Sequence, residues 1–374
     1  MKRIFTFAAI IFIYFLANYY VFRHINILIE YSSGWVKNVF FLLYLFLPTS
    51  FIVFFLFVKK LPVYPATLLY KISTGWMIIL VYSFLLFFLL DIVVYGIRQL
   101  QILPSSFLIE ETGVKIVLVL LLFIGIYGHL NYLQKRRIKL KIKTSKKLDT
   151  PLKIVMISDL HLGFAIRKKE LKEWIKKINE EKPDLLLIAG DIIDNSVRPL
   201  NYYHLEKYFK EIKAPLGTYA CLGNHEYLSN IGESISFINK TGIQLLRDSS
   251  VLVNQRFYIV GRDDRTNPAR KSLSELCEGL DRSKPVILLD HQPYHLEEAQ
   301  ENGIDLQLSG HTHRGQVWPL SLIADAIYED SHGYLKKGNT HIYVSSGIGI
   351  WGGRYRIGTQ SEYVVIEFSS KNEA

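Results

Sequence analysis

Four long apolar segments in the first third of the chain constrain its fold more than any other feature of the sequence. They cover residues 4–22, 39–58, 72–97 and 114–133, and few charged residues interrupt them. A helix rises about 1.5 Å per residue, so about 20 residues cross a hydrocarbon layer of about 30 Å. One such segment is compatible with a buried core helix. Four in succession predict a four-helix transmembrane region, which we place at residues 1–134.

The distribution of Lys and Arg predicts the orientation of these segments. On one side lie Lys2, Arg3, Lys59, Lys60, Lys71 and a run of eight Lys and Arg within residues 135–147. The opposite loops hold only Arg23, Lys37, Arg98 and Lys115. Cytoplasmic loops carry the excess of Lys and Arg. Both chain ends, and the domain after the fourth segment, are therefore expected in the cytoplasm.

Residues 135–150 are expected to form a basic juxtamembrane linker. The run QKRRIKLKIKTSKK contains no acidic residue. It serves as a topological anchor, as a surface for anionic lipid headgroups, or as both. Residues 151–374 are near neutral, with 27 basic and 29 acidic side chains. A nucleic-acid-binding domain usually presents a basic face, so no nucleic-acid partner is expected.

Residues 151–374 alternate apolar runs with helical patterns, which predicts an α/β domain. LKIVMIS, DLLLIAG, TYACLG and KPVILLD are typical of buried strands, as are residues 304–309, 340–345 and 362–368. Leu171, Trp174, Ile175 and Ile178 have the i, i+3, i+4, i+7 spacing of an amphipathic helix. Alternating strands and helices over 224 residues are sufficient for an independent core.

Polar side chains follow the apolar runs at the points where the strands should end. They are Asp159, His161, Asp191, Asp194, Asn224, His225, His291, His311 and His313. The carboxyl ends of strands are where α/β sheets present their sites. Oxygen and imidazole donors without cysteine suit Mn, Zn or Fe and disfavour a structural zinc site. Glycines at 190, 223 and 310 should let the backbone approach such ions closely.

Five motifs in order, SDLHLG, GDIID, GNHE, DHQP and GHTH, resemble those of the calcineurin-like metallophosphoesterases over about residues 152–368. The resemblance implies a sandwich of two mixed β-sheets flanked by helices. It also implies two divalent metal ions with Asp191 bridging them. One ion would be held by Asp159, His161, Asp191 and His313, and the other by Asp191, Asn224, His291 and His311. His225 would be the catalytic histidine beside the phosphate, oriented by Asp194, while Arg314 and Arg356 are expected to contact substrate.

The order of membrane segments and domain resembles a membrane-linked branch of this family, described as acting on lipid-linked substrates. We therefore expect a membrane-bound, dinuclear-metal phosphoesterase that cleaves a phosphodiester or pyrophosphate bond. Its expected substrate is a phospholipid or a UDP-2,3-diacylglucosamine-like lipid. The alternatives are a tethered phosphomonoesterase or nucleotidase, a catalytically silent metal-binding scaffold, and, against the charge balance, a nuclease. The sequence does not indicate an oligomeric state.

Overall fold

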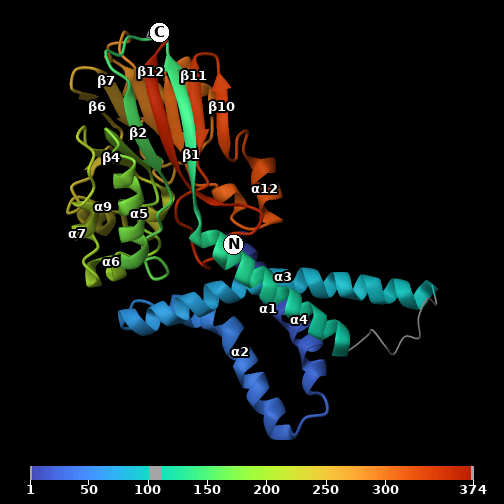
Figure 1. Cartoon of the computed structure of the whole chain (residues 1–374). Helices are drawn as coiled ribbons and strands as arrows, with labels where there is room; N and C mark the ends of the chain where they lie inside the picture. Colours follow the sequence, from blue (N-terminus) through green and yellow to red (C-terminus); the bar gives the residue numbers. More distant parts are fainter. Residues whose placement is uncertain (1, 101–110, 372–374) are drawn as a thin grey trace. The chain divides into compact units, whose positions relative to one another are not determined.

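The computed structural model describes residues 2–100 and 111–371, and the chain divides into two compact units. A helical unit comprises Met1–His129 together with Gly352–Tyr355. A phosphoesterase unit comprises Leu130–Trp351 and Arg356–Ala374. Figure 1 labels many of the elements of each unit.

The helical unit contains four helices that are long and apolar enough to cross a membrane, as predicted. They are α1 (Lys2–Asn26), α2 (Gly34–Phe57), α3 (Val63–Leu100) and α4 (Glu111–Leu133), with a short turn η1 (Ile27–Ile29) after α1. Buried Asn18 joins three of them. Tyr44 Oη donates to the Asn18 carbonyl at 2.6 Å, and Trp76 Nε1 donates to Asn18 Oδ1 at 2.9 Å. These bonds satisfy an amide that would be costly to leave unpaired in apolar surroundings.

The phosphoesterase unit is built on two mixed six-stranded sheets, which confirms the predicted sandwich. The first sheet has the order β1-β12-β2-β3-β4-β5 and the second β10-β11-β9-β8-β7-β6. Their bounds are β1 Lys135–Thr144, β2 Leu152–Ile157, β3 Leu185–Ala189, β4 Thr218–Cys221, β5 Gln244–Leu245, β6 Ser249–Val253, β7 Phe257–Gly261, β8 Val286–Leu289, β9 Leu306–Ser309, β10 Gly333–Lys337, β11 Thr340–Val344 and β12 Ser361–Ser370.

Helices connect the strands of these sheets. They are α5 Lys168–Glu180, α6 Arg198–Tyr202, α7 Glu206–Phe209, α8 Asn224–Leu228, α9 Ile231–Ile238, α10 Leu273–Cys277, α11 Glu297–Glu301 and α12 Leu320–Ile327, with a turn η2 His313–Gly315. The predicted stripe of α5 is buried, from Leu171 to Ile178. Apolar side chains from both sheets form one core, with Ile154, Leu187, Ile287 and Leu306 among its members. The predicted buried strands are confirmed as β2, β3, β4, β8, β9, β11 and β12, in which almost every side chain is buried.

The expected linker is instead largely a strand. Residues Lys135–Thr144 form β1, which pairs in parallel with β12 along its whole length. Ile138, Leu140 and Ile142 alternate with basic residues and pack against the core, while the lysines between them are exposed. Alternation at period two is the mark of a half-buried strand. The linker was predicted from the high content of basic residues, without regard to the alternation of apolar and basic residues.

Strand register places the start of β1 at the end of the sandwich that carries the candidate ligands. Lys135 pairs with Ser361, and β12 runs antiparallel to β2 with Val364 opposite Met156. The start of β1 therefore lies beside the carboxyl end of β2. We call this the ligand end, and the opposite one the far end. At about 3.3 Å per residue, the last lysines of β1 lie on the order of 20 Å from the ligand end.

Candidate metal centre

The expected ligands occupy loops with unusual backbone conformations. Asp159, His161, Asp191, His311 and His313 all have φ between 47° and 71°. Such conformations cost a residue with a side chain roughly 1–3 kcal/mol and persist where surrounding structure enforces them. Here the Asp159 amide donates to the Gly190 carbonyl at 3.1 Å, and the His161 amide to the Asp191 carbonyl at 3.0 Å. Each loop is thus held in place by its neighbour.

All three predicted glycines are required by close packing around these residues, and a Cβ on Gly310 would lie 2.4 Å from Asp159 Oδ2. A Cβ on Gly223 would lie 2.1 Å from Asp191 Oδ1, and one on Gly190 would lie 2.6 Å from His291 Nδ1. Gly190 also has a φ of +80°. Any side chain at one of these three positions would displace an expected ligand, so the prediction of close backbone approach is confirmed.

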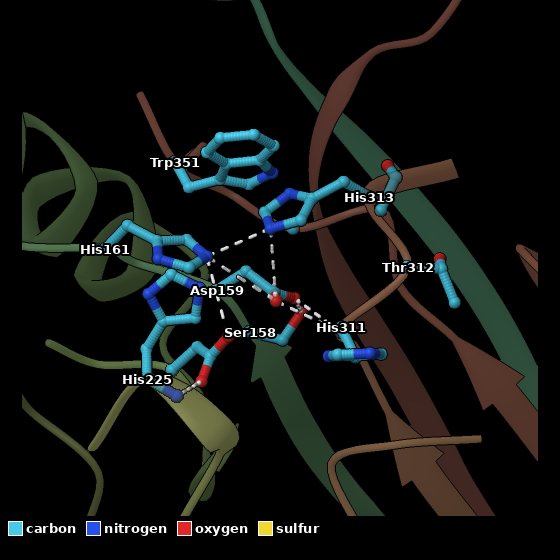
Figure 2. Close-up of polar contacts among 12 residues, drawn as sticks. Ser158, Asp159, His161, His225, His311, Thr312, His313 and Trp351 are labelled. Carbon is cyan, nitrogen blue, oxygen red and sulfur yellow. Dashed lines mark hydrogen bonds and ion pairs between the residues drawn. The ribbon is translucent and has the colours of Figure 1, made fainter. Parts of the chain in front are cut away.

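A first donor group consists of Asp159, His161 and His313, whose ligand atoms lie within 4.8 Å of one another. The Nε2 atoms of His161 and His313 are 2.9 Å apart. Asp159 Oδ1 lies 3.4 Å from His313 Nε2 and 3.9 Å from His161 Nε2. Figure 2 shows the two rings and the carboxylate converging on one point. Two imidazole nitrogens and a carboxylate facing each other in this way suit a shared cation.

A second donor group consists of Asp191, His291 and His311. His291 Nδ1 lies 2.7 Å from the Ala189 carbonyl, to which it donates, so His291 Nε2 is left as the ligand nitrogen. The amide oxygen of Asn224 is 2.9 Å from His311 Nδ1. Asn224, the fourth ligand predicted for this group, therefore lies in contact with His311.

Asp191 lies between the two groups. Its Oδ1 accepts the His225 amide at 2.9 Å, while its Oδ2 is 3.1 Å from His291 Nε2 and 3.6 Å from His161 Nε2. One oxygen thus faces a nitrogen of each group. This is the position that a bridging carboxylate must occupy.

The electrostatics of the donors suit divalent metal binding. Burial lowers the pKa of His311 to about 4, and burial with the charge of His161 holds that of His313 well below its usual range. Both shifts favour the neutral ring that a metal ligand needs. Burial opposes protonation of His291, yet the charge of Asp191 raises its pKa well above the usual value, and a bound cation would have to displace that proton. Burial alone would raise the pKa of Asp191, but the charges of His291 and His225 hold it well below its usual range. Burial raises the pKa of Asp159, and a bound cation would oppose that rise. The residues therefore fit divalent ions.

His225 lies close to both donor groups, and its ring forms a third group with His161 and Asp191 whose ligand atoms lie within 4.8 Å of one another. Asp194 holds the His225 ring. His225 Nδ1 donates to the Asp194 carbonyl at 2.9 Å and lies 3.4 Å from Asp194 Oδ1. The same Oδ1 is 3.6 Å from His161 Nδ1, so Asp194 orients a ligand as well. Burial opposes protonation, yet the charges of Asp191 and Asp194 raise the pKa of His225 to about 9. Its ring is partly exposed and its Nε2 is the atom left to face a substrate.

The two arginines expected to contact substrate differ in the structure. Arg314 is exposed, directly after the ligand His313. Arg356 is fully buried and donates to the carbonyls of His313 at 2.8 Å, Ser346 at 2.5 Å and Gly349 at 3.0 Å. The expectation for Arg356 is corrected, because a side chain without exposed surface supports the ligand loop and does not touch substrate.

Sequence reasoning missed two residues of the site. Glu226 is fully buried and accepts the amides of Asp191, Ile193 and Gly223 at 3.2, 2.9 and 2.7 Å. It joins the second and third ligand loops, and its place in the GNHE motif was the available signal. Trp351 lies next to His313 and His161 in Figure 2, and its indole is partly exposed. No local pattern in the sequence marks it.

The chain is similar to several proteins named as metallophosphoesterases. The family model described as calcineurin-like phosphoesterase matches residues 152–315. A metallophosphoesterase of Aquifex aeolicus (strain VF5) is 35% identical over 66% of this chain and 97% of its own. One from Helicobacter pylori (strain J99) is 31% identical over 75% of this chain and 77% of its own. A "transmembrane protein with metallophosphoesterase domain" from Danio rerio is 29% identical over 75% of this chain and 70% of its own.

Proposed function

This chain belongs to the calcineurin-like metallophosphoesterases, and we propose its reaction on that premise. It is a membrane-associated member, with four apolar helices ahead of the phosphoesterase unit. We propose that it binds two divalent ions and hydrolyses a phosphodiester or pyrophosphate bond in a lipid-linked substrate. A UDP-2,3-diacylglucosamine-like lipid and a phospholipid both fit this class.

The residues of the site have defined roles in such a hydrolysis. Divalent ions, when bound, lower the pKa of a water and neutralise phosphate oxygens. Asp191 Oδ2 serves both donor groups. Protonated His225, held through Nδ1 by Asp194, presents Nε2–H to the oxygen that leaves phosphorus. Arg314, exposed beside His313, is placed to meet an anionic part of the substrate.

The choice of a lipid-linked substrate rests on the position at which the chain enters the phosphoesterase unit. Only Gln134 separates α4 from β1, which starts at the ligand end. Asn131, in the last turn of α4, donates to the carbonyls of Arg356 and Thr359 at 2.9 and 2.8 Å. The Arg356 side chain in turn supports His313. The end of an apolar helix is thus tied to the ligand loops, which favours a substrate that remains in the bilayer.

The proposal is tested on the full-length protein in lipid nanodiscs with Mn²⁺. Hydrolysis of phospholipid and glycolipid diphosphate substrates in the disc is compared with hydrolysis of soluble nucleotides and of bis-p-nitrophenyl phosphate. We expect higher kcat/KM for a lipid substrate. A nucleotide or phosphomonoester preferred over every lipid would favour the tethered nucleotidase. No turnover of any ester by metal-loaded protein would favour the scaffold.

The cytoplasmic location is a separate part of the proposal and rests on the Lys and Arg distribution alone. Protease protection in spheroplasts tests it. We expect the phosphoesterase unit to survive external protease together with a cytoplasmic marker. Digestion of the unit while the marker survives would place it outside the cell.

A further inference from the structure

Helix α12 (Leu320–Ile327) buries small residues and exposes large apolar ones, which is the reverse of the usual arrangement for a surface helix in water. It buries Ser321 and Ala324, which are 8% and 7% exposed. It presents Leu322, Ile323 and Ile327, which are 59%, 54% and 57% exposed. A surface helix of a soluble domain normally turns its apolar stripe toward the core. The outer face of α12 is therefore built to meet something other than water.

The exposed apolar residues of the phosphoesterase unit concentrate at this helix. In the described residues 135–371, nine large hydrophobic side chains are exposed, and five of them lie within ten residues. These five form what we call the α12 patch: Trp318, Leu320, Leu322, Ile323 and Ile327. Single exposed apolar residues are ordinary on protein surfaces, whereas a contiguous group marks an interaction surface.

The α12 patch is fixed to the ligand loop. The turn η2, which contains the ligand His313, precedes α12 by a few residues. A Cβ on Gly315 would lie 2.4 Å from the carbonyl carbon of Leu320, so η2 and α12 are in direct backbone contact. Beyond α12, Thr312 Oγ1 donates to the Ser331 carbonyl at 2.5 Å, and Ser331 Oγ donates to Asp325. The α12 patch and the loop that carries His313 are therefore attached to each other.

The patch lies at the ligand end, the end at which an apolar helix enters the unit. Asn131 in α4 and the ligand His313 both bind Arg356, through its carbonyl and its guanidinium respectively. Trp318 precedes α12, and its amide donates to the Ile357 carbonyl at 2.7 Å, next to Arg356. The patch and the end of α4 are therefore attached to the same short segment, residues 356–359.

We propose that the α12 patch docks on the bilayer surface, with its aliphatic side chains among the upper acyl chains and Trp318 at headgroup level. Helices with an apolar face lie in this layer about 5–10 Å into the headgroup and acyl boundary. Trp is enriched at the same depth. Exposed Arg314 on the adjoining turn supplies a cation for anionic headgroups. The inference goes beyond the proposed function, because contact with lipid does not require that the substrate be a lipid.

The experiment uses full-length protein in nanodiscs of phosphatidylethanolamine and phosphatidylglycerol, with one chain per disc. A nitroxide spin label is attached at Ile323→Cys, and collisions with oxygen and with a water-soluble nickel complex are measured. Oxygen concentrates in lipid, whereas the nickel complex stays in water. We expect the oxygen-to-nickel collision ratio at residue 323 to exceed that at a water-exposed position several-fold.

Glu301→Cys is the matched control, since Glu301 is exposed at the far end on α11. Cys221 and Cys277 are buried, so the unsubstituted protein supplies the labelling background. Ile327→Cys is a second reporter should the first variant misfold, and unchanged hydrolysis of bis-p-nitrophenyl phosphate verifies folding. Free access of nickel at residue 323 would place the patch in water. Exclusion of both reagents would show that protein covers it. Either outcome overturns the proposal, whatever the substrate proves to be.

Discussion

Each end of the sandwich buries a carboxylate, but the groups that surround the two carboxylates differ. At the far end, Asp305 is buried and three donors meet its carboxylate: Thr144 Oγ1 at 2.5 Å, Lys146 Nζ at 2.7 Å and the Val286 amide at 2.8 Å. At the ligand end, Asp191 is equally buried, yet its Oδ2 faces two imidazole nitrogens.

The surroundings of Asp305 and Asp191 distinguish a buried carboxylate that stabilises the fold from one that can bind metal. The donors around Asp305 come from both sheets and satisfy it within the fold, as stable buried charges require. The groups around Asp191 are themselves potential ligands, and nearby backbone is in strained conformations. Substitution at the far end should therefore change stability alone, while substitution at the ligand end should change metal content and turnover.

The largest effect is expected for Asp191→Asn, which should lose metal from both donor groups and all measurable turnover. An amide is a poorer bridge because it carries no charge. His161→Ala is the comparison variant and should empty mainly the first group. Metal content of the purified proteins, measured by inductively coupled plasma mass spectrometry, checks this. Equal metal loss in the two variants would contradict the bridging role.

His225→Ala should retain its metal and lose turnover by about 10²–10⁴-fold, the usual effect of removing a general acid. The physical reason is that the His225 ring stands beside the donor groups with Nδ1 held by Asp194. Kinetics with bis-p-nitrophenyl phosphate and metal analysis are measured on the same sample. His204→Ala, at an exposed histidine of the same unit, is the control and should behave as the unsubstituted protein. Loss of metal from the His225 variant would make His225 a ligand.

At the far end, Asp305→Ala should lower the free energy of unfolding of the phosphoesterase unit by about 1–3 kcal/mol, because buried donors lose their acceptor. The kcat of the folded fraction should stay unchanged. Chemical denaturation followed by intrinsic fluorescence gives the first quantity, and active-site-normalised kinetics the second. A fall in kcat without a fall in stability would remove the distinction between the two ends.

The smallest effect concerns the ion pair that attaches β1 to α5. Arg137 donates to Glu181 at 2.5 and 2.6 Å and lowers the pKa of that carboxyl below its usual value of 4.5. The unfolded chain therefore binds this proton more tightly. The stabilisation is complete above pH 4.5 and is lost as the pH falls through the lower, folded pKa.

Glu181→Gln should accordingly cost no more than about 1 kcal/mol at neutral pH, as partly exposed ion pairs do. It should also flatten the loss of stability below the carboxyl pKa. Denaturation midpoints measured from pH 3 to pH 7 check both statements. Turnover at pH 7 should not change, since this pair lies outside the metal centre. A steeper acid dependence in the variant would contradict the sign of the shift.

Local sequence patterns predict many of the elements of this protein and the positions of its candidate ligands. The membrane segments, the buried strands other than β7 and the stripe of α5 follow from hydrophobic length and period, which are local properties. The positions of Asp159, His161, Asp191, Asn224, His291, His311 and His313 follow from their place after apolar runs. The approach of Asp191 Oδ2 to both donor groups depends on loops from two sheets, so it arises only in the folded structure.

Residue type and local pattern fix the composition of each element: which helices are apolar throughout, which loops carry donor side chains, and which segments carry the positive charge. Tertiary structure decided what each element faces. Basic residues 135–144 became a strand because β12 offers a free edge to residues that alternate in polarity. Arg356 turned inward because His313, Ser346 and Gly349 present carbonyls to it. Periodicity marks two faces on a segment, but only packing partners from distant parts of the chain choose which face is buried, as the opposite choices of α5 and α12 show.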